Sequence, residues 1–390
     1  MNNDKLNLAL ERFVRRFEEF NTKVLEKFGK TIKKFEKLTP SQAHKLAQQM
    51  KNGRDIEKIL ADLERISELS RKDIEDLLEI TAKENIDFAN TYYEAKKMDK
   101  VSYEDSKQFQ NLVKAVEKTT KGEFTNLSKT TALKLLKDNG KPLYLDIKKA
   151  YNEVIDRCVL AVATGQMDYQ KAMYDTIKQL SSSGVKKVYY DNKGKQAYAR
   201  RLDSSVRMNI LDGVRQVNIG IQEQVGKEFG ANGVEVSHHV NCAPDHIHID
   251  GKQFGKKQFE KINNNLTRPV ASMNCRHFVF SIVLGVSSPL YTKKQLEQDR
   301  KNNEKGFEYE GKHYTLYEGE QLQRKIELAV RQQKDLQIIA KSSNDKDTIS
   351  KTQNNITQLT QKYKELSKIS GLPTKMDRMR VVGYKRTSTK

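Results

Sequence analysis

The segments VEVSHHVNCAPDHIHIDGKQF (residues 234–254) and ASMNCRHFVF (residues 271–280) carry most of the polar chemistry of the 390-residue chain. Together they hold five of its seven histidines and two of its three cysteines. Their short apolar runs indicate β-strands on either side of a loop rich in histidine and cysteine. We therefore expect a small β-containing module in the middle of the chain.

Long amphipathic helices are predicted on the N-terminal side of this module. Over the first 37 residues, apolar side chains recur at steps of three or four: Phe13, Phe17, Phe20, Val24, Phe28, Ile32 and Phe35. Such a stripe is typical of a helix in a core or of a seam with a partner helix. The sequence TPSQ (39–42) then predicts a new helix, with Thr39 as N-cap and Gln42 closing a capping box, and Gly53 marks its end. A further helix is expected over 55–97.

The remaining patterns predict helix over 103–180, with breaks near Gly122, Pro142 and Gly165, and a β-hairpin over 185–200. A helix over 203–229 leads into the module, and a second hairpin follows at 306–317. The fold class is α+β and predominantly α-helical, with long N-terminal helices, a small central Cys/His module and a C-terminal helical hairpin. The predicted regions are 1–100, 101–184, 185–317, 318–372 and a basic, loosely ordered tail at 373–390.

Composition limits the class of protein. The sequence has no run of the roughly 18–20 apolar residues that a membrane-spanning helix needs. Its charged start is unlike a secretory signal peptide, and three cysteines in so long a chain argue against a disulfide framework. We therefore expect synthesis in a cytoplasm and no membrane partner. The net charge of +20 fits either solvated helix faces in a lysine-rich protein or a protein that works beside nucleic acid.

The histidine and cysteine cluster has three interpretations. The first is a structural zinc site, for which the ligand candidates are Cys242, His246, His248, Cys275 and His277. His246 and His248 are two residues apart, which on a strand would put both rings on one face. The second is catalytic, with a histidine as general base in a metal-dependent nuclease. The third, which we favour, is structural: polar side chains join two β segments by hydrogen bonds. No cofactor is then required, although zinc would suit the cluster.

At these residues the chain resembles the tailed-phage minor capsid protein family and, more distantly, the Mu-type head-morphogenesis family. The resemblance is carried by a strand ending in histidine, a Pro-Asp-His step, a Gly-Lys pair and an Asn-Cys-Arg-His motif. In this chain the motif residues are His238, Pro244, Asp245, His246, Gly251, Lys252, Asn274, Cys275, Arg276 and His277. The resemblance continues through the hairpin and the helix that follow, and it is specific over residues 185–375.

The resemblance implies a non-enzymatic, low-copy structural protein of the phage head, made in the host cytoplasm and located in the virion. Its partners would be the portal protein, capsid and scaffold proteins, and packaged double-stranded DNA, the last through non-specific electrostatics. On this basis the phenylalanine stripe of residues 1–37 is expected to face the portal or a second copy of the chain. The alternatives are a metal-dependent nuclease or effector that uses the Cys/His cluster, and a DNA-binding protein without a role in capsid assembly.

Overall fold

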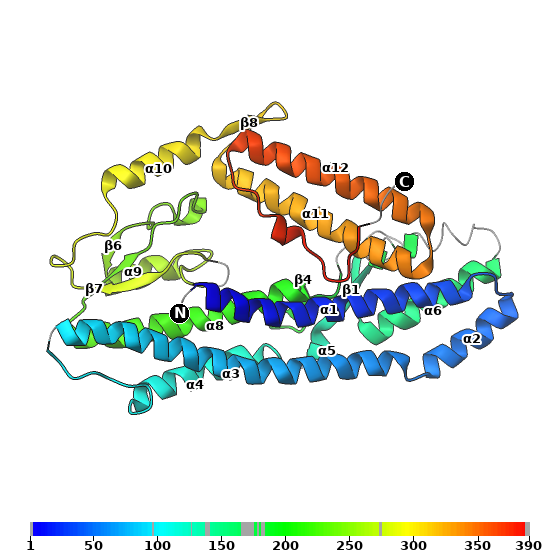
Figure 1. Cartoon of the computed structure of the whole chain (residues 1–390), viewed down its shortest axis with the longest axis horizontal. Helices are drawn as coiled ribbons and strands as arrows, with labels where there is room; N and C mark the ends of the chain where they lie inside the picture. The colour runs from blue at the N-terminus through cyan, green and yellow to red at the C-terminus, as the bar shows by residue number, and fades with distance from the viewer. Residues whose placement is uncertain are drawn as a thin grey trace.

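The computed structural model describes residues 3–95, 97–125, 127–136, 141–164, 175–177, 179–180, 184–272 and 275–386. The N-terminal half is an elongated layer of helices, and the C-terminal helical hairpin lies on it (Figure 1). The helices of this layer are α1 (Asn3–Phe35), α2 (Pro40–Asn52), α3 (Asp55–Ala95), α4 (Lys107–Gly122), α5 (Leu127–Thr130), α6 (Ile147–Thr164) and α8 (Leu202–Glu228). Later helices are α9 (Lys256–Asn264), α10 (Lys293–Lys305), α11 (Leu316–Ser343) and α12 (Lys346–Ser370).

The structure confirms the helix ends that were predicted from neighbouring residues in the sequence. Helix α2 begins at the capping box formed by Thr39 and Gln42 and is followed by Gly53. Helices α11 and α12 form the expected hairpin, with Asn344 in the left-handed conformation between them and Asp345 as the N-cap of α12. The fold is therefore predominantly α-helical, as the sequence predicts. Among the described residues, no helix is both long and apolar enough to cross a membrane.

Helix α1 lies at the centre of the helical layer, in contact with α3, α6, α8 and α11 (Figure 1). Its phenylalanine stripe is buried in the largest apolar core of the chain, and Phe17, Phe20 and Phe35 are each 0% exposed. The expectation that this stripe faces the portal or a second copy is therefore wrong. The stripe is used inside the chain, because helices from both halves of the sequence cover it.

Helix α11 approaches α1 closely at Gly29. A Cβ atom at this position would lie 2.5 Å from the carbonyl oxygen of Ile339, so only glycine permits the contact. A buried polar network joins the same helices. Asp335 of α11 pairs with Arg201 and accepts a hydrogen bond from Asn21 of α1 at 3.2 Å. The C-terminal hairpin is thus joined to the N-terminal helices by both apolar and ionic contacts.

In the described part of the chain, three antiparallel sheets interrupt the helices. The largest has the strand order β2-β1-β3-β4, the module sheet has the order β6-β5-β7, and the third pairs β8 with β9. Their bounds are β1 (Thr131–Leu136), β2 (Pro142–Asp146), β3 (Lys186–Tyr190), β4 (Gln196–Arg201), β5 (Gly233–Val236), β6 (Gln253–Gly255), β7 (Val279–Ile282), β8 (Phe307–Tyr309) and β9 (Lys312–Tyr314). The hairpins predicted at 185–200 and 306–317 are confirmed as β3–β4 and β8–β9.

The helix predicted on either side of the break near Pro142 is wrong at 131–136 and 142–146, because these residues form the paired strands β1 and β2. Leu133 pairs with Leu145, and Thr131 pairs with Lys187 of the distant strand β3. A short apolar run such as TALKLL fits a strand or a helix equally well, and pairing with a remote strand decides between them. Much of the remaining prediction for 165–183 lies outside the described residues.

The expectation of a loosely ordered tail is also wrong over 371–386. The tail contains a 3₁₀ helix, η2 (Met376–Met379), and returns across α1, where Thr22 Oγ1 donates a hydrogen bond to Val382 O at 2.6 Å. Met379 and Val381 are buried. Apolar side chains therefore hold a segment whose composition is otherwise basic. The last residues, 387–390, lie outside the described part, and the predicted boundaries between regions stay predictions.

Candidate metal centre in the histidine and cysteine module

The module consists of strands β5, β6 and β7 with helix α9, and it lies beside α10 at one end of the molecule (Figure 1). Its own apolar cluster is small and comprises Val234, Val236, Ile249, Phe254, Val270 and Cys275. Beyond the strand ends, Ser237 exchanges two hydrogen bonds with Phe278, at 2.9 and 2.8 Å. These bonds hold the loop after β5 beside the chain that enters β7. The two polar segments of the sequence therefore meet here.

Asp250 is the centre of a buried hydrogen-bond network. It is 2% exposed, and its two oxygens face His238 Nδ1 at 2.7 Å and His277 Nε2 at 3.0 Å. The backbone N–H of His239 donates to Oδ1 at 2.8 Å. One carboxylate thus fixes two imidazole rings and a loop amide, which accounts for its burial as a charged group.

The network continues from the module into helix α10. His238 Nε2 lies 3.0 Å from Asp299 Oδ2, so Asp299, His238, Asp250 and His277 form a row in which carboxylates alternate with imidazoles. A small cleft next to this row is lined by residues that include His238, Cys242, Asp250 and Asp299. Helix α10 is therefore joined to the module by its polar side chains.

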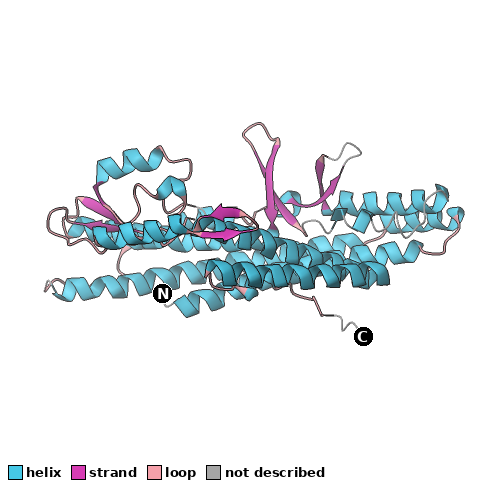
Figure 2. Cartoon of the chain, turned by 90° about the horizontal axis from the view of Figure 1, so that it is seen from above, coloured by secondary structure: helices cyan, strands magenta, loops and turns pink. Residues whose placement is uncertain are grey.

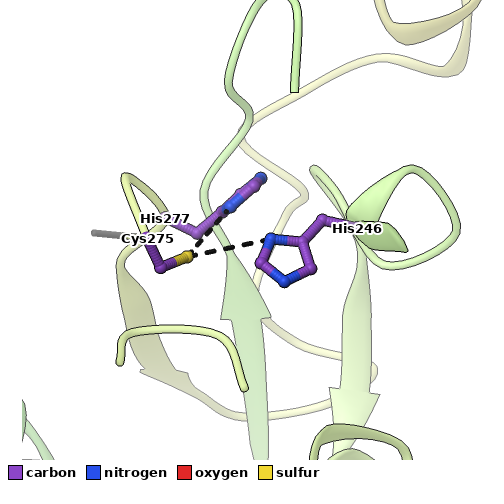
Figure 3. Close-up of side chains that lie close together, drawn as sticks. All are labelled: His246, Cys275 and His277. Atoms are coloured by element: carbon purple, nitrogen blue, oxygen red, sulfur yellow. Dashed lines mark hydrogen bonds between the residues drawn. The ribbon is translucent and has the colours of Figure 1, made fainter. Parts of the chain in front are cut away.

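His246, Cys275 and His277 form a second buried group on the far side of His277 (Figure 3). Cys275 Sγ lies 3.4 Å from His277 Nδ1 and 3.8 Å from His246 Nδ1. The other nitrogen of His246, Nε2, faces the carbonyl oxygen of Arg268 at 2.7 Å. All three side chains are at most 3% exposed. These are ligand types that zinc accepts, and they converge on one point.

The structure brings most of the predicted site residues together and leaves others out. Cys242 joins His277 and Asp250 in an overlapping group whose ligand atoms lie within 4.8 Å of one another. His248, in contrast, is exposed and belongs to neither group. The strand assumed for His246 and His248 is absent from the structure of this segment, because η1 (Pro244–His246) is a 3₁₀ turn.

The other motif residues shape the loops around the cluster. Gly251 has a φ of +68°, a conformation that favours glycine, and Lys252 Nζ donates to the carbonyl oxygen of His248 at 2.9 Å. Asp245 accepts a hydrogen bond from Arg268 at 3.1 Å. Arg276 faces His239 at 2.9 Å and Glu320 of α11 at 3.4 Å. Asn274 lies outside the described residues.

Comparison with known families gives one match that covers most of the chain. The family model described as "Phage minor capsid protein 2" matches residues 1–367, which is nearly the whole chain and includes the module. The chain belongs to the phage minor capsid protein 2 family. The family expected from the sequence is thereby confirmed. Comparisons with curated proteins and with solved structures give no match for this minor capsid protein.

Two residues that the minor capsid protein uses here were missed at the sequence level. Asp299, 61 residues further along the chain, contacts His238 from helix α10, and Arg268 contributes its backbone carbonyl to His246. Spacing along the chain gives no signal for either contact. Only the position of α10 beside the module reveals the first, and only the fold of the 265–272 turn reveals the second.

Burial and hydrogen bonding shift the pKa values of the cluster in opposite directions. Burial lowers the pKa of His246, and burial together with the Arg276 charge lowers the pKa of His239. For His277, burial opposes protonation, but hydrogen bonds with Asp250, Cys242 and Cys275 outweigh it and raise the pKa to about 11. Burial by itself would raise the pKa of Asp250, because it disfavours the charged carboxylate. Hydrogen bonds with His277 and His238 outweigh burial and keep that pKa below the ordinary value. Asp250 is therefore held as a carboxylate.

Replacing Asp250 with alanine is expected to destabilise the module of the minor capsid protein by roughly 2–3 kcal/mol, because two buried imidazoles and one amide lose their acceptor. Hydrogen exchange over residues 233–305 measures this local effect directly. His248→Ala in the same loop is the matched control and should leave protection unchanged, since His248 is exposed. Equal protection in Asp250→Ala and wild type would show that Asp250 does not hold the module together.

Proposed function

We propose that the chain is a low-copy structural protein of the phage head that associates with the portal and the procapsid interior and contacts packaged DNA. The observation that carries this proposal is the match of a capsid-protein family over residues 1–367. The composition supports the DNA contact, because a net charge of +20 favours binding to a polyanion. Cross-linking of purified procapsids tests the first part: links between this chain and the portal protein support it, and links to neither portal nor shell proteins contradict it.

The surface that best suits DNA is the sheet β2-β1-β3-β4. Its strands rise away from the layer of helices (Figure 2). Lys193 and Lys195 are exposed at the tip of the β3–β4 hairpin. Nearby, Tyr198 is 45% exposed and stacks on Tyr189 with ring centroids 4.6 Å apart, while the Arg200 guanidinium lies 5.3 Å from the centroid of the Tyr198 ring. A projecting hairpin with cations and exposed aromatic rings can follow a phosphate backbone without reading its sequence.

Replacing both Lys193 and Lys195 with glutamine is expected to weaken binding to double-stranded DNA. If each lysine contacts one phosphate, the slope of log K against log salt should fall by about 0.9 per lysine. Binding isotherms at several salt concentrations measure this slope. The matched control replaces Lys45 and Lys58, which are exposed on α2 and α3, and makes the same change in net charge. Equal loss of slope in the two double variants would contradict a specific role for the hairpin.

The family is structural, which supports our proposal that the chain is not an enzyme. The rival proposal is a metal-dependent nuclease or effector that would use the row of carboxylates and imidazoles beside the cleft. The two proposals differ in a direct assay. We expect intact DNA after incubation of the pure protein with Mg²⁺, Mn²⁺ or Zn²⁺. Cleavage that disappears in His238→Ala would overturn the structural assignment.

A further inference from the structure

The group formed by His246, Cys275 and His277 has the dimensions of a zinc site. Zinc–sulfur bonds of about 2.3 Å and zinc–nitrogen bonds of about 2.0–2.1 Å put tetrahedral S and N ligands roughly 3.5 Å apart. Cys275 Sγ lies 3.4 and 3.8 Å from the Nδ1 atoms of His277 and His246. In Figure 3 both rings point their Nδ1 atoms toward the sulfur. The two sulfur–nitrogen distances thus match edges of a coordination tetrahedron.

The outer nitrogen of each ring has an acceptor that fixes its tautomer. His246 Nε2 donates to the carbonyl oxygen of Arg268, and His277 Nε2 donates to the Asp250 carboxylate. Both Nδ1 atoms are then directed at Cys275. Without a metal, Nδ1 of His277 can carry a proton and donate it to the sulfur, which leaves the Nδ1 lone pair of His246 facing the same sulfur. A cation between the sulfur and the two Nδ1 atoms would bind all three. Acceptors on the other ring nitrogen, like the Arg268 carbonyl oxygen and the Asp250 carboxylate here, usually support histidine ligands in zinc sites.

Cys242 is the second thiol of the module, and its sulfur is grouped with His277 and Asp250 rather than with His246 and Cys275, so it has to shift to become the fourth ligand. Its ligand atom shares a group with those of His277 and Asp250, all within 4.8 Å of one another. It lies on the turn that begins at Asn241, where φ is +58°, directly before the 3₁₀ turn that contains His246. Asp250 already accepts bonds from His238, His277 and the amide of His239, which leaves it as a support rather than a ligand. Two thiolates would also balance the charge of a buried divalent cation.

We propose that the module binds one structural zinc ion through Cys242, His246, Cys275 and His277. The ion joins the loop after β5 to the segment that enters β7, which stabilises a module with a small apolar cluster of its own. His248, one of the residues expected to bind zinc, is excluded from the site because it is exposed. The proposal is independent of the location in the phage head, since a chain without zinc could still be incorporated.

Elemental analysis of the full-length chain, purified after addition of zinc and removal of the excess, tests this site. The expected result is one zinc per chain in wild type and in His248→Ala, and a loss of at least tenfold in occupancy in His246→Ala and Cys275→Ser. Wild-type protein without zinc, or equal occupancy in His246→Ala and His248→Ala, overturns the proposal. Circular dichroism shows whether each variant keeps its helices.

Substitution by cobalt gives a test that does not depend on any variant folding. Thiolate ligands produce a sulfur-to-cobalt charge-transfer absorption, and a four-coordinate site gives intense visible bands. The proposal requires both signals in the cobalt-loaded wild-type chain, together with displacement of the cobalt by one equivalent of zinc. Absence of the charge-transfer absorption shows that no cysteine binds the metal and overturns the assignment.

Discussion

The free energy of unfolding is expected to fall by roughly 3–5 kcal/mol when Asp335 is replaced with alanine. Asp335 is 0% exposed on α11 and pairs with Arg201, whose side chain is 5% exposed. It also accepts a hydrogen bond from Asn21 of α1. Removing its carboxylate leaves a buried guanidinium whose one remaining ionic partner among the described residues is Asp203, at 3.3 Å. The substitution should therefore loosen the C-terminal hairpin from the N-terminal helices.

Urea denaturation followed by circular dichroism measures this loss. The matched control is Asp62→Ala, which removes the same side chain from a pair with Lys23 whose side chains are 34% and 55% exposed. Exposed pairs contribute about 0–1 kcal/mol, so this control should remain close to wild type. A double variant, Arg201→Met with Asp335→Leu, removes both charges and is expected to recover much of the stability. Similar stability of Asp335→Ala and Asp62→Ala would show that the buried pair is not what joins the two halves.

Replacing Phe20 with alanine is expected to destabilise the isolated chain by about 3–5 kcal/mol, because a fully buried aromatic ring leaves a cavity in the main core. Phe20 is 0% exposed and belongs to the core that α1 shares with the helices around it. Phe88→Ala is the control, since Phe88 is 55% exposed on α3. Thermal unfolding of the two variants compares them. Wild-type stability in Phe20→Ala would mean that the stripe is a partner surface after all.

The phenylalanine stripe was expected to face a partner and is instead buried in the core of the chain. This difference shows what the sequence can predict. A spacing of three and four residues specifies a helix with one apolar face, and the capping box at Thr39 specifies where the next helix begins, because both depend on neighbours along the chain. Neither signal says what covers the apolar face. In this protein α11 does so, about 300 residues away in sequence, with Gly29 permitting the close approach.

Contacts between residues far apart in the sequence also explain the two wrong predictions, a helix where β1 and β2 lie and a loosely ordered tail. Strand β1 exists as a strand because it pairs with β2 and with the distant β3, and the basic tail is ordered because Thr22 and the core around Val381 hold it. Some features of the candidate site could likewise be predicted from the sequence, and others depend on the fold. The residue types and the two segments were evident from composition, and their meeting followed from the predicted strands. The exclusion of His248 and the contribution of Asp299 depend on a 3₁₀ turn and on the position of α10, which no local pattern encodes.

The measurement that tests the role in the phage head most directly is quantitative mass spectrometry of purified procapsids and DNA-filled heads. Both particles should contain this chain in amounts far below that of the major shell protein, and the chain should remain after washing with high salt. Absence of the chain from both particles, while it accumulates free in the infected cell, would contradict its assignment to the head.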